Sequence, residues 1–473
     1  MNSNRGIVEY FGSSFASDYC GYCKGKKPSG VDSGKCRAGV WAHFLTANNY
    51  QLMIDRGWRR SGKYCYKPDL KKSCCPPYTI KCDVLNFKLS KSQKKILNNV
   101  YRFLVFGDKR NIASTNNPTA RAIQSDTTTV PKSECVSGRR LSDCDMKAIK
   151  SDGSRGQKAK YLRFQHSVKK TMDKQQCDRE TALILVKERR EKRNINRREK
   201  PLKDRINFTL PAKSAHKLDV RFVSTMNDEY QKDVDVSHKV YEMYQRTIHG
   251  DKPEECAKKQ FCRFLINTPL EKEEFVVNVN GKSESYFPTS YGSYHMQYWL
   301  DDELIAVGVI DILPKCVSSV YFYYNPNYEF LSLGTYSALR EIQLVQSLNT
   351  VNEQIQEYYM GFYIHSCPKM RYKRKYFPSF LLCPETFTWI PAEHCISLLD
   401  KNEYNRLQSD QSVTDEDING IGDEDILILF DNQLVTYSVY KLMTGSEDQA
   451  EVYEFAKLMG KNCVSNVLLY RSN

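Results

Sequence analysis

The chain has 473 residues, enough for two or three domains that each bury a core. Its 70 Lys and Arg exceed its 56 Asp and Glu, and the resulting net charge of +14 favours a polyanionic partner, although basic segments around an ordinary domain would give the same balance. No stretch approaches the ~20 apolar residues of a membrane span, and no apolar signal core follows Met1. We therefore expect a soluble intracellular protein whose 17 cysteines are mostly reduced thiols rather than a disulfide framework.

The first 79 residues are rich in Cys and Gly and contain little core of their own. Short strands are predicted at Gly6–Phe11 and Tyr64–Tyr66, and a helix at Ala47–Gly57. A two-residue spacer lets two thiolates reach one ion, and a second Cys pair from a distant loop completes a tetrahedron. We therefore predict a metal site with the ligands Cys20, Cys23, Cys74 and Cys75.

The chemistry of this site stays open at the level of sequence. Zinc and an iron–sulfur cluster both suit four thiolates. Adjacent cysteines rarely bind one small ion together without strain, and buried or redox-active thiols are a further alternative. Replacement ligands would come from Cys36, Cys65, Cys82 or His43.

A basic turn, DRGWRRSGKY, lies between the two Cys pairs at residues 55–64. Its cations flank Trp58 and would suit an anion held by fork-shaped hydrogen bonds. Composition alone favours a simpler arrangement, a solvated basic turn with Trp58 in the core.

The middle of the chain changes character after Gly107, which ends a helix predicted over Ser90–Phe106. Residues 108–157 contain few apolar side chains and are expected to form a disordered insertion. Thr181–Lys200 is predicted to be a charged helix, either solvated or in contact with an RNA backbone. Arg205–Thr225 then suggests a hairpin, and Val234–Ile248 a helix.

The segment from Gly292 to Glu385 carries the clearest pattern. An antiparallel meander is followed by a helix and a returning strand, which is the central pattern of a GNAT-like acyltransferase domain. We therefore predict an α+β protein with a mixed central sheet and a small Cys-rich amino-terminal module. The predicted elements are the strands Tyr294–Leu300, Glu303–Leu313 and Val317–Tyr324, the helix Leu331–Leu348 and the strand Tyr358–Ile364.

The remaining chain, after residue 400, contains an acidic loop at 415–425 that we expect to be exposed and mobile. A strand at Ile426–Phe430 and a helix at Glu447–Leu458 follow it. The predicted organisation is an amino-terminal module at 1–106, an insertion at 107–204, a catalytic domain at 205–400 and a completing segment at 401–473.

Several strings resemble the arginyl-tRNA–protein transferase family: CGYC at 20–23, DRGWRRSGKYCYKP at 55–68, CCPPYTIKC at 74–82 and MGFYIHSCPKMRYK at 360–373. With the central segment, the resemblance covers about residues 6–106 and 206–400. It implies transfer of arginine from arginyl-tRNA to proteins that begin with Asp, Glu or oxidised Cys, which marks them for ubiquitin-dependent degradation. It also implies location in the cytoplasm, with the nucleus left open as a second compartment.

The resemblance implies charge recognition at both ends of the reaction. Cations must bind the acidic side chain of the acceptor protein, and carboxylates must bind the donor's guanidinium. For Asp311, the alternative is a structural pair with a resident Arg or Lys. The acceptor-binding candidates are Arg56, Trp58, Arg59, Arg60 and Lys63, and the donor-binding candidates are Asp311 and Glu341.

The donor's ester is already activated and the acceptor amine has a pKa of about 7.7 to 8.0, so no covalent nucleophile or strong base is expected. The turn before the predicted helix has one glycine, which argues against coenzyme A. The rival functions are a coenzyme A acetyltransferase and a non-catalytic RNA-binding metalloprotein. Candidate contacts to the tRNA are Ser332, Gly334, Lys369, Arg371, Tyr372 and Lys373, and cleft residues without an assigned role are Tyr363 and His365.

Overall fold

The computed structural model describes residues 5–15, 20–23, 36–109, 159–196, 200–226, 228–275 and 287–472. The chain forms two compact units, one made of residues 1–116 and 206–473 and the other of 117–205. The predicted segments 1–106 and 401–473 thus share a unit with the central domain. Most of the insertion predicted to be disordered lies outside the described residues.

The larger unit contains a nine-stranded mixed sheet, whose strands follow the order β13-β12-β5-β11-β10-β9-β8-β6, with β7 added to β8. The predicted meander is confirmed, because β8, β9 and β10 pair antiparallel in sequence. The strands are β5 Tyr78–Asp83, β6 Leu218–Ser224, β7 Glu273–Glu274, β8 Ser290–Leu300, β9 Glu303–Ile312, β10 Cys316–Tyr324, β11 Glu357–Tyr363, β12 Ser379–Leu382 and β13 Trp389–Pro391.

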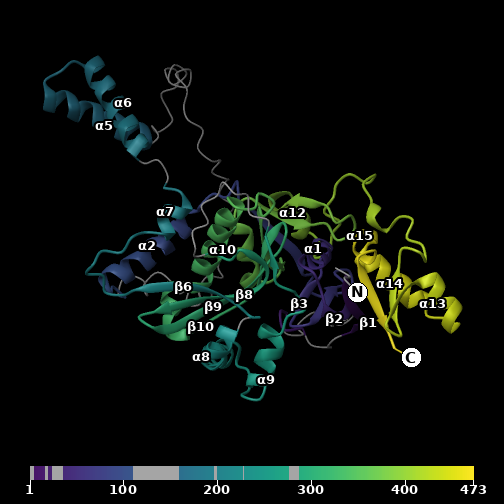
Figure 1. The fold of residues 1–473 in the computed structure, drawn as a ribbon. Coiled ribbons are helices and arrows are strands. Elements are labelled where there is room, and N and C mark those ends of the chain that lie inside the picture. The colour runs from purple at the N-terminus through teal and green to yellow at the C-terminus, as the bar shows by residue number, and fades with distance from the viewer. Residues whose placement is uncertain are drawn as a thin grey trace. The chain divides into compact units, whose positions relative to one another are not determined.

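One strand of this sheet comes from the amino-terminal segment. β5 pairs antiparallel with both β11 and β12, so the chain immediately after Cys74-Cys75 is built into the central sheet. Helix α10, Leu333–Asn349, contacts β10 and β11 and lies against the sheet (Figure 1). It confirms the predicted helix, and β11 confirms the returning strand.

A second sheet of seven strands has the order β15-β14-β16-β1-β2-β4-β3. The first and last strands of the chain, β1 and β16, pair in parallel, side by side (Figure 1). Trp58 is fully buried in the core of this sheet. Its strands are β1 Gly6–Phe15, β2 Cys36–Phe44, β3 Arg59–Ser61, β4 Tyr64–Pro68, β14 Leu427–Phe430, β15 Gln433–Thr436 and β16 Val467–Arg471.

The turn between β3 and β4 fits closely against another part of the chain. Gly62 has φ +64°, and a Cβ there would lie 1.9 Å from the carbonyl oxygen of Arg263. Only glycine tolerates both the left-handed backbone and this approach. The contact fixes β3, and with it Arg59 and Arg60, against the π-helical segment η4, Cys262–Ile266.

Two predictions about local structure are wrong. The hairpin predicted over Arg205–Thr225 is instead a short helix, α7 Leu202–Ile206, followed by the single strand β6. β6 pairs with β8, about 75 residues further along the chain, so its alternating pattern has no local partner. The acidic loop is not simply exposed, because Asp415 and Asp417 bind the buried Arg56.

Helices cover the remaining surfaces of the larger unit. The predicted helix over Val234–Ile248 is α8, Asp228–Tyr244, which continues as a π-helical segment, η3 Gln245–His249. The others are α1 Ala47–Asp55, α2 Lys91–Phe106, α9 Lys258–Phe261, α11 Pro368–Arg371, α12 Ala392–Leu399, α13 Tyr437–Thr444, α14 Gln449–Met459 and α15 Lys461–Val464, with the 3₁₀ segments η5 Pro326–Leu331, η6 Tyr372–Lys375 and η7 Glu416–Ile418.

The smaller unit contains a helical hairpin of α5, Ala159–Gln175, and α6, Arg179–Asn196. The two helices pack through Val168, Ala182 and Val186. Helix α6 confirms the charged helix predicted from the sequence, while its contact with RNA stays a prediction. In the described part of the chain, none of the helices is both long and apolar enough to cross a membrane.

Candidate active site

A pocket opens in the central sheet where two parallel strands part. β10 and β11 pair from Cys316 with Glu357 to Ser318 with Tyr359, and both strands continue beyond the last pair. The pocket has a volume of about 620 Å³. It is lined by residues of β3, β10, β11, α10 and η6, including Arg59, Arg60, Ser319, Phe322, Gly334, Glu341, Tyr358, Phe362, Tyr372 and Lys373.

Glu341 places a buried carboxyl group in the wall of this pocket. It lies on α10 and is 1% exposed. Its Oε1 accepts a hydrogen bond from Ser337 Oγ at 2.8 Å, and its Oε2 accepts one from Tyr358 OH at 2.7 Å. Burial raises the pKa of Glu341, which these hydrogen bonds partly oppose. Both carboxylate oxygens are therefore oriented, and neither is paired with a cation in the described residues.

Arg59 places an incompletely satisfied cation in the same pocket. Its Nη1 donates to the carbonyl oxygens of Trp58 at 2.6 Å and Ile54 at 3.3 Å. The guanidinium also lies over the rings of Tyr359 and Phe362, 5.8 and 5.5 Å from their centres. Within the described ranges, its buried Nε and Nη2 have no hydrogen-bond partner. Because an unpaired buried charge is costly, this arrangement suits an anionic ligand.

The next residue, Arg60, has a different environment. Its Nε and Nη2 form a two-pronged ion pair with Asp311, at 2.7 and 2.6 Å, and both side chains are almost completely buried. Ser293 Oγ also donates to Asp311 at 2.7 Å. The separate roles predicted for these residues, acceptor binding by Arg60 and donor binding by Asp311, are not supported by this geometry. It matches the alternative weighed for Asp311, a structural pair with a resident Arg.

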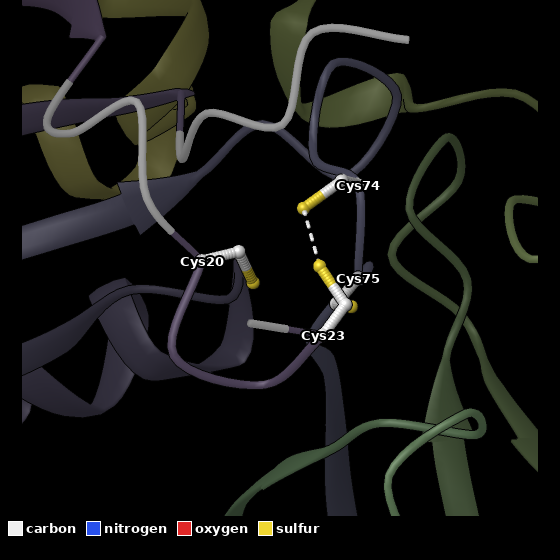
Figure 2. Close-up of side chains that lie close together, drawn as sticks. All are labelled: Cys20, Cys23, Cys74 and Cys75. Carbon is white, nitrogen blue, oxygen red and sulfur yellow. Dashed lines mark hydrogen bonds between the residues drawn. The ribbon is translucent and has the colours of Figure 1, made fainter. Parts of the chain in front are cut away.

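The four predicted metal ligands form one cluster. The Sγ atoms of Cys20, Cys23, Cys74 and Cys75 all lie within 4.8 Å of one another, and Figure 2 shows the two pairs facing each other. The Sγ atoms of Cys23 and Cys74 are 3.8 Å apart. This is close to the ~3.8 Å expected between two thiolate sulfurs on a tetrahedral zinc ion with Zn–S bonds of about 2.3 Å. The alternative ligands Cys36, Cys65, Cys82 and His43 are not part of the cluster.

The thiols of this cluster differ in acidity. Burial disfavours the Cys20 thiolate, but hydrogen bonds from the backbone amides of Cys23 and Tyr22 and from neighbouring thiols lower its pKa to about 7. Burial and the neighbouring cysteines raise the pKa of Cys75 to about 11. A cation would offset this mutual repulsion, so the residues fit a metal ion. Tyr22, which lies between Cys20 and Cys23, also lines the large pocket, so the segment with these two cysteines is part of the pocket wall.

Comparison with known proteins gives the family. The model described as "Arginine-tRNA-protein transferase, N terminus" matches residues 18–95, and the one described as "Arginine-tRNA-protein transferase, C terminus" matches 236–383. Arginyl-tRNA–protein transferase 1 of Drosophila melanogaster is 37% identical to the chain, covering 98% of it and 99% of the relative. The chain belongs to the arginyl-tRNA–protein transferase family.

More distant relatives agree with this assignment. Arginyl-tRNA–protein transferase 1 of Arabidopsis thaliana is 31% identical over 81% of the chain and 73% of the relative. The protein of the same name from Dictyostelium discoideum is 30% identical over 83% and 85%. The two matched regions include the cysteine cluster and Arg59 on one side, and Glu341 and Lys373 on the other.

Three further residues predicted to bind the acceptor of this transferase lie outside the pocket. Arg56 donates to Asp415 at 2.7 and 3.0 Å, and it lines a separate cavity of about 560 Å³. Trp58 is fully buried, and its Nε1 donates to the carbonyl oxygen of Leu458 at 3.2 Å. Lys63 donates to a backbone carbonyl in β2. Of the predicted acceptor-binding residues, Arg59 is thus the one that lines the pocket with guanidinium nitrogens free to bind a ligand.

The residues predicted to contact tRNA divide in two groups. Gly334, Lys369, Tyr372 and Lys373 line the pocket. Ser332 lies in a left-handed conformation before α10 and its amide donates to Glu329, while the side chain of Arg371 donates to the carbonyl oxygen of His365. Neither of these two residues lines the pocket.

Tyr363 and His365, the residues predicted to face the cleft, form a hydrogen-bonded chain elsewhere. Tyr363 OH lies 2.7 Å from His365 Nδ1, and His365 Nε2 lies 2.8 Å from Asp400 Oδ1. These hydrogen bonds link the end of β11 to the end of α12. None of the three residues lines the pocket.

Sequence reasoning missed Arg37, which lines the pocket from β2. Its guanidinium lies 5.3 Å from the ring centre of Tyr64 and 5.6 Å from that of Tyr66. Among the described residues, no carboxylate is paired with it. In the sequence, Arg37 differs from its apolar neighbours only by its charge, and that charge does not indicate a pocket. The pairing of β2 with β4 was needed to locate Arg37 beside the tyrosines of β4.

We predict that the Arg60–Asp311 pair is a structural unit. Asp311→Ala leaves a buried guanidinium unpaired and should lower the free energy of unfolding by about 3 to 5 kcal/mol. The double variant Arg60→Met/Asp311→Leu should recover more than half of that loss, measured by chemical denaturation. Glu242→Ala, which breaks the exposed pair of Glu242 with Arg246, is the control and should cost less than about 1 kcal/mol. No recovery in the double variant would contradict the prediction.

We also predict that the cysteine cluster binds metal. Cys23→Ser should reduce the metal bound per chain, measured by elemental analysis of the purified protein, because it removes one of four ligands. Cys65→Ser is the matched control, since Cys65 is buried outside the cluster. Unchanged metal content in Cys23→Ser, with the fold intact, would refute the site.

Proposed function

We propose that the protein transfers arginine from arginyl-tRNA to the α-amine of proteins that begin with Asp or Glu, and that oxidised amino-terminal Cys is a third acceptor. This transfer marks the acceptor for ubiquitin-dependent degradation. The observation that carries the proposal is one pocket that holds both an open cation, Arg59, and a buried carboxyl group, Glu341. The names of the compared relatives, which describe transfer between arginyl-tRNA and protein, support it.

In this proposal the donor's arginine side chain binds Glu341. A carboxylate held by Ser337 and Tyr358 presents fixed oxygens to a planar guanidinium, a geometry that Arg matches with two parallel hydrogen bonds. Burial of the site strengthens the interaction, because water does not screen it. The 3′ end of the tRNA then follows the pocket past Gly334, Lys369 and Tyr372.

The acceptor's acidic side chain binds Arg59, with Arg37 nearby in the same wall. A carboxylate would satisfy Nε and Nη2 of Arg59 together, and the sulfinate of an oxidised cysteine offers the same pair of oxygens. In this proposal Arg59 and Glu341, which line the same pocket, select opposite charges, and the acceptor's amine meets the donor's ester in that pocket.

The chemistry requires alignment more than activation. The ester of a charged tRNA is reactive. Holding it against a free amine can lower the activation barrier by several kcal/mol, because the entropy cost of bringing the two groups together is met on binding. The architecture resembles a GNAT-like domain, which we propose as the fold: the donor enters where β10 and β11 part, beside the amino-terminal end of α10. The single glycine of the preceding turn argues against coenzyme A as donor.

We propose zinc or an iron–sulfur cluster as the group held by Cys20, Cys23, Cys74 and Cys75. Its contribution is structural, since it joins the loop after β1 to the loop before β5 and so fixes Tyr22 in the pocket wall.

The first prediction of this proposal concerns the reaction. Purified protein incubated with radiolabelled arginyl-tRNA should label peptides that begin with Asp or Glu, and should not label the matched peptide that begins with Ala. A coenzyme A acetyltransferase would instead transfer acetyl from acetyl-coenzyme A. A non-catalytic RNA-binding protein would retain the tRNA without transfer. Either result would replace the proposal.

The second prediction separates the two ends of the pocket. Arg59→Met should raise KM for the Asp peptide by roughly 10- to 100-fold, the equivalent of one charge-assisted hydrogen-bond pair, with little change for arginyl-tRNA. Glu341→Gln should instead raise KM for arginyl-tRNA. Its free energy of unfolding should not fall, because a neutral amide replaces a carboxyl whose pKa is raised by burial. Arg102→Met, an exposed change on α2, is the control. An equal effect of Arg59→Met on both substrates would disprove the assignment.

A further inference from the structure

Lys373 occupies the point where the two parallel strands part. It lies on η6, and its Nζ donates to the carbonyl oxygens of Met360 and Phe362 of β11, each at 2.8 Å. These carbonyls follow Tyr359, the last residue of β11 that pairs with β10. Between them, Gly361 has φ +73°, and a Cβ there would lie 4.0 Å from Nζ of Lys373 and 3.9 Å from the carbonyl oxygen of Ser319 in β10. Lys373 is therefore bound to β11 where the sheet opens, and it lines the pocket.

The geometry at Nζ suits a neutral amine. A neutral lysine has two N–H groups and one lone pair, whereas the ammonium form has three N–H groups. Two donor positions are taken by the carbonyls, and in the described part of the chain no third partner is bonded to Nζ. One tetrahedral position is thus left, which carries either a lone pair or a proton.

The surroundings also disfavour the charged form. Burial, and secondarily the positive charge of Arg59, lowers the pKa of Lys373 to about 7, against a small opposing effect of Cys367. Among the described residues, Glu341 is the one carboxyl group that lines the pocket, and it lies on α10 with its oxygens accepting hydrogen bonds from Ser337 and Tyr358. The other titratable groups of the lining are Arg37, Arg60 and Lys369, with the tyrosines Tyr22, Tyr50, Tyr66, Tyr244, Tyr321, Tyr324, Tyr358, Tyr372 and Tyr376.

We propose that Lys373 is the proton acceptor for the amine of the acceptor protein and returns that proton to the leaving ribose oxygen of the tRNA. The inference rests on the proposed function and extends it, because the sequence assigned Lys373 only a contact with phosphate. Lys373 lines the same pocket as Arg59 and Glu341, in which the proposed function brings the amine and the ester together.

The step balances without another reactant. The α-amine nitrogen attacks the ester carbonyl carbon, and a C–N bond forms. The nitrogen's surplus proton passes to Nζ of neutral Lys373. The C–O bond to ribose then breaks, and the ammonium of Lys373 gives its proton to the ribose oxygen. The products are the peptide amide and the free 3′ end, and Lys373 is neutral again.

The first arm of the test uses the unaltered protein. Trace labelling with acetic anhydride across pH 5 to 11, read by mass spectrometry, reports the pH at which each amine becomes reactive. Lys373 should become reactive near pH 7, and Lys375, an exposed neighbour on the same segment, is the internal reference. A profile for Lys373 that matches that of Lys375 would overturn the proposal.

The second arm uses Lys373→Arg, which places a permanently charged guanidinium at this position that cannot act as a proton acceptor. Single-turnover transfer from prebound arginyl-tRNA to an Asp peptide should slow by about 100-fold or more, within the range for loss of general base catalysis. KM for arginyl-tRNA should change little, and the rise in rate near pH 7 should disappear. Lys375→Arg is the matched control and should behave as the wild type.

The outcomes separate the possible roles. If Lys373 only contacts phosphate, Lys373→Arg will retain its rate, and Lys373→Met will lose affinity for arginyl-tRNA instead. Thermal unfolding of each variant identifies a folding defect, and in that case the labelling arm on the unaltered protein decides alone. Failure of the proposed function has a different signature, since the wild type itself would then transfer no arginine.

Discussion

The buried ion pair between Arg60 and Asp311 holds the two sheets of the larger unit together. Arg60 belongs to β3 of the seven-stranded sheet and Asp311 to β9 of the nine-stranded sheet, 251 residues later in the chain. Such a pair adds little net stability over an apolar contact, because both charges lose their hydration. Its value lies in position, since two parallel hydrogen bonds allow only one alignment of the strands.

That alignment determines what the neighbouring residue can do. With Arg60 fixed against β8 and β9, Arg59 is directed to β11, where two of its nitrogens remain open beside Phe362. The cation and the carboxyl group of Glu341 therefore line one pocket although 282 residues separate them in the sequence. The cysteine cluster fixes the adjoining wall, and β5, which follows it directly, is part of the central sheet. The amino-terminal segment thus contributes a strand to the nine-stranded sheet.

Local sequence patterns predicted many of the helices and strands of this fold. They did not predict which strands pair when the partners are far apart in the sequence. The meander, α10 and β11 follow from alternation and helical spacing within some seventy residues, and the metal ligands from two compact Cys pairs. By contrast, β6 pairs with a strand far along the chain, and β1 with the last strand of all. No periodicity within either segment specifies such a partner.

The candidate site shows the same limit at single residues. Composition makes the cations of the basic turn equivalent, yet tertiary contacts give each a separate role: Arg56 binds Asp415, Arg60 binds Asp311, and Arg59 remains open. Asp311 is a charge in an apolar strand, from which we predicted donor binding and kept a resident cation as the alternative, and the sequence did not identify that cation as Arg60. Glu341 carries no such signal on an amphipathic helix, and only its burial beside Tyr358 distinguishes it.

The electrostatics of the pocket connect acceptor recognition to proton transfer. Burial lowers the pKa of Lys373, and the positive charge of Arg59 lowers it further, because two neighbouring cations repel each other. A carboxylate bound to Arg59 would offset that positive field, so the pKa of Lys373 would rise and the lysine would become a stronger base. A peptide that begins with Ala leaves the repulsion in place. The acidic side chain would then contribute to the rate of transfer as well as to binding, through one pairwise interaction between residues of β3 and η6.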